Sequence, residues 1–78
     1  RAKKLAISFH EKLVNENLFD DLFAILNKNQ GKCDVVFNLA LNEKLKVEIL
    51  SLPLRVQGTK NLEREIISRG GEVYWFLN

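Results

Sequence analysis

The side chains that could take part in catalysis are few and scattered along this sequence. His10 is the single histidine and Cys33 the single cysteine, and no nucleophile-and-base set, glycine-rich phosphate loop or CxxC pair accompanies them. A reactive thiol needs a cationic neighbour or a helix N-terminus. We therefore interpret Cys33 as a small buried hydrophobe and His10 as an exposed loop histidine, and we expect no catalytic residue.

The acidic residues that most resemble a metal site are Glu16, Asp20 and Asp21. They fall in the first turns of a predicted helix, where carboxylates interact favourably with the positive end of the helix dipole. We interpret them as a solvated helix face. The sequence thus predicts no metal, no cofactor and no small-molecule ligand.

The composition fits one small domain. The chain has 78 residues and is 46 % hydrophobic, and its 12 Lys and Arg against 10 Asp and Glu give a net charge of only +2. This charge is small for a clustered nucleic-acid surface. No apolar run approaches the roughly 18–20 residues of a membrane span, and no signal peptide is recognised, so we expect a cytoplasmic protein. Because the sequence starts at Arg1 and lacks methionine, we expect residues 1–78 to be one domain excised from a longer chain.

The first half of the chain predicts a strand and then a helix. Alternating apolar residues predict a strand over 4–9. Apolar residues then recur at helical spacing: Leu18, Phe19, Leu22, Phe23, Ile25 and Leu26. We expect a helix over 16–29, with Asn15 as its N-cap. A capping box at 8–11 offers a rival start, which would shorten the first strand.

The second half predicts a hairpin, a helix and a final strand. Alternation over 33–40 and 45–50 predicts two antiparallel strands joined by a short polar turn. Pro53 cannot donate to a strand ladder, so we expect the third strand to end or bulge near Leu52, leaving 54–56 extended. Thr59 caps the second helix. The residues expected to face inward from that helix are Leu62, Ile66 and Ile67, and the last strand is expected over 73–77.

The β-α-β-β-α-β order predicts an α+β fold: a split βαβ, ferredoxin-like sandwich, with a mixed four-stranded sheet and two helices on one face. The alternation then predicts a partner-binding patch on the other face, made of Val36, Leu50, Tyr74 and Phe76. Its expected polar rim is Asp34, Asn38, Lys46 and Glu48. A register shifted by one residue would instead bury Tyr74 and Phe76 and expose Trp75.

The same element order is found in the RNA-recognition fold, which stacks bases on aromatics of its middle strands. The strand expected over 45–50 has no aromatic residue and no Lys/Arg-Gly-Phe pattern. A free-standing single-stranded nucleic-acid-binding module therefore stays the alternative interpretation, with Tyr74 or Phe76 stacking on bases. The residues that would contact phosphates are Arg1, Lys3, Lys4, Lys44 and Lys46. A small-molecule regulatory domain ranks last, because no glycine precedes Gln30 to form a ligand-binding turn.

An ordered set of segments resembles a known family. The segments are Leu5-Ala-Ile-Ser-Phe, Leu26-Asn-Lys-Asn-Gln-Gly-Lys, Cys33-Asp-Val-Val-Phe-Asn-Leu, Leu54-Arg-Val with capping Thr59, Leu62-Glu-Arg-Glu-Ile-Ile and Gly71-Glu-Val-Tyr-Trp. Together they are similar to the C-terminal domain of the bacterial DNA polymerase III alpha subunit, over about residues 4–77. The chain departs from that family at Leu54, where a tryptophan is usual, and at Asp34, where a proline is common.

The resemblance implies a role in DNA replication. The parent chain would be a DNA-directed DNA polymerase whose catalytic carboxylates lie far upstream, so this domain itself would not be an enzyme. Its implied partners are the tau subunit of the clamp loader or neighbouring polymerase domains, with nucleic acid reached through the parent chain. The resemblance implies no individual binding residue.

Overall fold

Strands and helices alternate along the chain in the predicted order. The computed structural model describes residues 2–77. Its elements are β1 (Lys4–His10), the 3-10 helix η1 (Glu11–Leu13), α1 (Glu16–Lys28), β2 (Gln30–Ala40), β3 (Lys46–Val56), α2 (Lys60–Ser68) and β4 (Glu72–Phe76). The β-α-β-β-α-β prediction is therefore confirmed.

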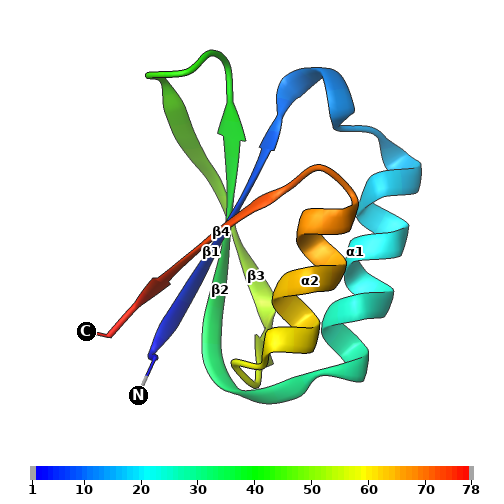
Figure 1. Cartoon of the computed structure of the whole chain (residues 1–78), viewed down its shortest axis with the longest axis vertical. Helices are drawn as coiled ribbons and strands as arrows, with labels where there is room; N and C mark the ends of the chain where they lie inside the picture. Colours follow the sequence, from blue (N-terminus) through cyan, green and yellow to red (C-terminus); the bar gives the residue numbers. More distant parts are fainter. Residues whose placement is uncertain (1, 78) are drawn as a thin grey trace.

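The strands form one mixed sheet in the order β3-β2-β1-β4. β1 is parallel to β2, whereas the β2·β3 and β1·β4 pairs are antiparallel. Figure 1 shows both helices on the same side of this sheet. The α+β class, the mixed four-stranded sheet and the two-layer, ferredoxin-like sandwich are confirmed.

One detail of the predicted topology is corrected, because β1 and β2 are direct neighbours and no strand splits the βαβ unit. A split arrangement would place β3 in the interior of the sheet. Pro53 lies within β3 and cannot donate a ladder hydrogen bond, which favours an edge position. The consecutive buried residues Val35, Val36 and Phe37 make β2 suitable for the interior.

The core lies between the sheet and the helices. Its buried side chains are Leu5, Ile7, Phe9, Leu18, Leu22, Ile25, Leu26, Cys33, Val35, Phe37, Leu52, Val56, Leu62 and Ile66. The Phe37 ring lies 6.2 Å from that of Phe9 and 5.0 Å from that of Phe19, measured between centroids, so α1 packs on β2 through Phe19. Odd-numbered residues of β1 and β2 face this core, as the alternation predicted.

The helix ends follow local capping. The Asn15 side chain accepts a hydrogen bond from the Leu18 backbone N–H at 2.8 Å, and Thr59 Oγ1 accepts one from that of Leu62 at 3.1 Å, which confirms both predicted caps. The rival start at residues 8–11 is replaced by η1, which His10 caps. Ile67 was expected to face inward, but it is 52 % exposed because the helix turns it away from the sheet.

Candidate functional site

The side of the sheet opposite the helices, here called the open face, is ordered into rows by the strand register (Figure 1). Three rows run across all four strands from β4 to β3: the first is Phe76, Lys4, Asp34 and Arg55, and the second is Tyr74, Ala6, Val36 and Ser51. The third row is Glu72, Ser8, Asn38 and Glu48. A fourth row, which β4 does not reach, is His10, Ala40 and Lys46. Residues that pair across neighbouring strands share a face. Six of these side chains are thus charged and lie among apolar and uncharged polar ones.

The predicted register of β4 is confirmed. Tyr74 is 41 % exposed and Phe76 43 % exposed, and both lie on the open face. Val73 and Trp75 pack against the core instead. The Trp75 indole N–H donates a hydrogen bond to Glu63 Oε1 at 2.9 Å, which ties β4 to α2. The register shifted by one residue is therefore wrong.

The other members of the predicted patch lie elsewhere. Val36 is on the open face but only 7 % exposed, because β2 is an interior strand, so it offers a partner little surface. Leu50 pairs with Phe37, whose side chain is in the core, and therefore lies on the helix side. The next pair joins Asn38 to Glu48 and skips Ile49. This β-bulge reverses the alternation, so placing Leu50 on the open face was wrong.

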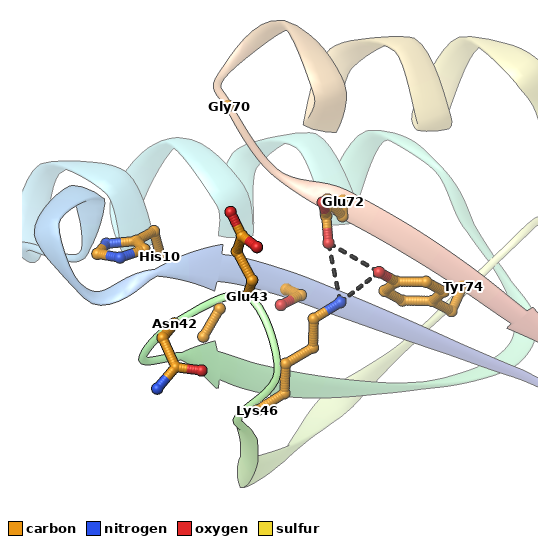
Figure 2. A pocket seen from close by; sticks show the side chains of 9 residues that line it. His10, Asn42, Glu43, Lys46, Gly70, Glu72 and Tyr74 are labelled. Atoms are coloured by element: carbon orange, nitrogen blue, oxygen red, sulfur yellow. Dashed lines mark hydrogen bonds and ion pairs between the residues drawn. The ribbon is translucent and has the colours of Figure 1, made fainter.

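A cluster of three polar side chains joins the two edges of the sheet across the open face (Figure 2). The Lys46 ammonium from β3 donates to Glu72 Oε1 at 2.9 Å and to the Tyr74 hydroxyl, and its nitrogen lies 4.2 Å from the Tyr74 ring centroid. Tyr74 in turn donates to Glu72 Oε1 at 2.7 Å. We call Lys46, Glu72 and Tyr74 the cross-sheet cluster.

The cluster shifts the pKa values of its charged members in opposite directions. Hydrogen bonds from Lys46 and then Tyr74 lower the pKa of Glu72. The hydrogen bonds with Tyr74 and then Glu72 raise the pKa of Lys46. Each shift stabilises the charged form. Lys46 is thus an engaged cation rather than one held free for a phosphate.

Beside the cluster lies a hollow of about 380 Å³. Its lining residues are Ser8, His10, Ala40, Asn42, Glu43, Lys46, Gly70, Glu72 and Tyr74. Figure 2 shows Glu43 and Glu72 entering it from opposite sides. Two buried polar atoms beneath this region, Ser8 Oγ and Asn38 Oδ1, have no hydrogen-bond partner among the described residues. The floor of the hollow therefore offers unpartnered polar atoms to a polar group.

The basic residues of the nucleic-acid interpretation are only partly brought together. Lys4 lies on the open face, and its ammonium nitrogen is 4.9 Å from the centroid of the Phe76 ring. This contact resembles that of Lys46 with the Tyr74 ring. Lys3 precedes β1, and Lys44 lies in the β2–β3 turn. Arg1 lies outside the described residues.

The residues considered for catalysis have structural contacts. His10 Nδ1 accepts a hydrogen bond from the Lys12 backbone N–H at 3.1 Å, which caps η1. Burial, and then the charge of Asp34, raises the pKa of the Cys33 thiol and so disfavours the thiolate. Asp21 lies 3.9 Å from Arg69 in an ion pair between the helices. Among residues 2–77, no three His, Cys, Asp or Glu side chains are grouped so as to hold a metal.

Sequence reasoning missed an exposed apolar group on the β2–β3 hairpin. Its members are Leu41, Leu45, Val47, Ile49 and Leu50, each between 36 and 53 % exposed. Val47 pairs with Leu39 and therefore lies on the helix side of the sheet. The hairpin, however, extends beyond both helices (Figure 1). The length of β3, eleven residues against a helix α2 of nine, is the signal that could have shown this.

Comparisons with protein families and with curated proteins found no match for this chain. Over residues 2–77, none of the helices has the length and apolar character needed to cross a membrane.

Proposed function

We propose that this chain is a non-catalytic protein-interaction domain that docks a partner on its open face. We further propose that it belongs to the C-terminal region of a replicative DNA polymerase alpha subunit and acts in DNA replication in the cytoplasm. Its partner is then the tau subunit of the clamp loader, or a neighbouring domain of the same polymerase. The ordered segments described above support the polymerase assignment, and the open face supports docking.

The observation that carries the docking proposal is the exposed aromatic pair on β4. Tyr74 and Phe76 are two residues apart on one strand, so both rings present to the same side. Aromatic side chains bury roughly 150–250 Å² each and are enriched among residues that dominate interface energetics. Tyr74 is 41 % and Phe76 43 % exposed, so a large part of both residues is available to a partner.

The surroundings of the pair fit a docking surface as well. A lysine ammonium lies over each ring: that of Lys4 over Phe76 and that of Lys46 over Tyr74. Cation–π contacts strengthen from about 0.5–1 kcal/mol when exposed to about 2 kcal/mol when desolvated, so a covering partner would strengthen both. The Asp34–Arg55 ion pair, at 3.1 Å, supplies a polar rim at the far edge.

A calorimetric titration with the C-terminal region of tau tests the proposal. The wild-type domain is expected to bind, and a Tyr74→Ala, Phe76→Ala double variant is expected to bind at least about tenfold more weakly while unfolding cooperatively. Ile67→Ala is the matched control, because Ile67 is an exposed hydrophobe on α2. No binding at high micromolar concentration would remove tau as the partner. Equal binding by the double variant would remove the open face as the interface.

Single-stranded nucleic acid is the second candidate, favoured by the same lysine-over-aromatic contacts. The acidic residues Asp34, Glu48 and Glu72 share that face and oppose phosphate binding. A fluorescence titration with an oligonucleotide at low salt decides between the two candidates. Binding that weakens by about 0.7 log units per phosphate contact for each log unit of salt would support nucleic acid. A flat response would end that candidate.

A further inference from the structure

β3 presents an unpaired edge. It is the outermost strand of the sheet, and β2 is its only strand partner among the described residues. The outward backbone N–H and C=O groups of such a strand are free to pair with another chain. β3 is also long, at eleven residues, which makes this edge the larger of the two that the sheet exposes.

The same edge is apolar where it leaves the helices. Leu45, Val47 and Ile49 are 48, 43 and 53 % exposed, and Leu41 and Leu50 adjoin them. Figure 1 shows this hairpin projecting past α1 and α2, so neither helix covers it. Clustered exposed aliphatic side chains of this kind mark an interaction surface.

The usual protection of an edge strand is missing from this stretch. Lysines that project from an edge commonly block pairing, as do prolines and bulges. Lys46, however, is turned inward onto Glu72 at 2.9 Å. Pro53 lies at the other end of β3, and the register shift begins only at Ile49. Residues 46–48 therefore form a regular and unblocked edge, which Leu45 directly precedes.

We propose that two copies of this chain pair antiparallel through β3, with the twofold axis at Val47. Residues paired across such a junction must lie on the same face of the joined sheet. An axis between two neighbouring residues would pair residues of opposite faces, so the twofold axis has to pass through a single residue. An axis at Lys46 or at Glu48 would place like charges opposite each other. An axis at Val47 places Lys46 opposite Glu48 of the second copy, and brings the exposed side chain of Leu45 near Ile49 of the second copy, beside the bulge.

This pairing leaves the proposed docking surface free. The two four-stranded sheets would join into one continuous sheet, with all helices on one side and both open faces on the other. β4 carries Tyr74 and Phe76 and stays at the outer edge of each copy. The dimer therefore does not rest on the docking proposal, and failure of either one leaves the other standing.

Light scattering coupled to gel filtration, at increasing concentrations of the 78-residue chain, is the first test. We expect a concentration-dependent dimer, with Val47→Lys raising the dissociation constant at least tenfold because it places two cations at the axis. Ile67→Lys, on α2, should leave the dimer unchanged. A monomer at all concentrations up to about 1 mM, or a dimer that Val47→Lys does not weaken, would overturn the proposal.

Cysteine cross-linking tests the register itself. Paired Cα atoms at an antiparallel axis lie about 4.5–5.5 Å apart, within the range of a disulfide. Val47→Cys is therefore expected to form a covalent dimer under mild oxidation, whereas Ile67→Cys at the same concentration is not. The native Cys33 is buried and should not interfere. Equal cross-linking of the two variants would contradict an axis at Val47.

Discussion

Lys46 and Tyr74 belong to the two opposite edge strands of the sheet, yet the Lys46 nitrogen lies 4.2 Å from the centroid of the Tyr74 ring. In a flat sheet three strand spacings, about 14 Å, would separate these strands. The contact shows that the sheet curls so that the β2–β3 hairpin approaches β4 over the open face (Figure 2). This curvature forms the polar hollow and holds one of the two aromatic side chains proposed to bind a partner.

The cross-sheet cluster predicts a pH dependence of stability. Because the folded-state pKa of Glu72 is lowered, its contribution is present above the ordinary glutamate pKa and is lost as the pH falls through the folded value. Both side chains are solvated, so we expect the cluster to contribute about 0.5 kcal/mol to the free energy of unfolding at pH 7, and less as the pH falls below the ordinary glutamate pKa. Urea unfolding of wild type and Glu72→Gln at several pH values measures this. A difference that does not change with pH would contradict the assignment.

Removing the hydroxyl of Ser8 should stabilise the fold. Ser8 is buried, and its Oγ has no partner among the described residues. A buried polar group without a hydrogen bond costs about 1–3 kcal/mol, so Ser8→Ala is expected to raise the free energy of unfolding by about 1 kcal/mol. The control is Ser51→Ala, because Ser51 is exposed. This variant is expected to change the free energy of unfolding by no more than about 0.5 kcal/mol. A loss of stability in Ser8→Ala would show that the hydroxyl has a bound partner.

Gly31 should not tolerate a side chain. A Cβ there would lie 2.5 Å from the backbone nitrogen of Gln57 and 2.7 Å from the carbonyl carbon of Val56. Since backbone atoms cannot rotate away, we expect Gly31→Ala to destabilise the domain by about 1–3 kcal/mol. At Gly58 the nearest atom to an added Cβ would be 3.2 Å away in the Trp75 ring, so Gly58→Ala should lower the free energy of unfolding by less. Urea unfolding of the two variants measures both changes. Equal losses would refute the close approach at Gly31.

The contact between Trp75 and Glu63 should be visible by fluorescence, because Trp75 is the only tryptophan. Glu63→Ala leaves the half-buried indole N–H without its acceptor, and we expect a loss of about 1 kcal/mol with an altered emission maximum. Glu63→Gln retains an acceptor oxygen, so its free energy of unfolding and its emission maximum should lie closer to those of the wild type. If both variants behave alike, the hydrogen bond does not hold β4 against α2.

Features that depend on neighbouring residues were predictable from the sequence. The caps at Asn15 and Thr59 need only a side chain and a backbone N–H three residues on. The period of two over β4 likewise gave the exposed positions of Tyr74 and Phe76. Both signals are local, and the sequence contains all of their determinants.

Features that depend on distant residues were not predictable in the same way. The bulge at Ile49 depends on how β3 meets β2, so the alternation alone placed Leu50 on the wrong face. The contact of Lys46 with Glu72 joins residues 26 positions apart and requires the curvature of the whole sheet. Pro53 did carry a usable signal, since a proline within a strand favours an edge or a bulge, and so disfavours a topology with β3 in the interior.

Docking of a protein partner on the open face should leave a chemical-shift footprint on the strands that form it. Backbone amide spectra of the labelled domain would be recorded as the C-terminal region of tau is added. We expect the largest shifts on β4 around Tyr74 and Phe76, and on β1 beside them, with α1 and α2 unchanged. Shifts confined to the helices, with β4 unperturbed, would contradict docking on this face.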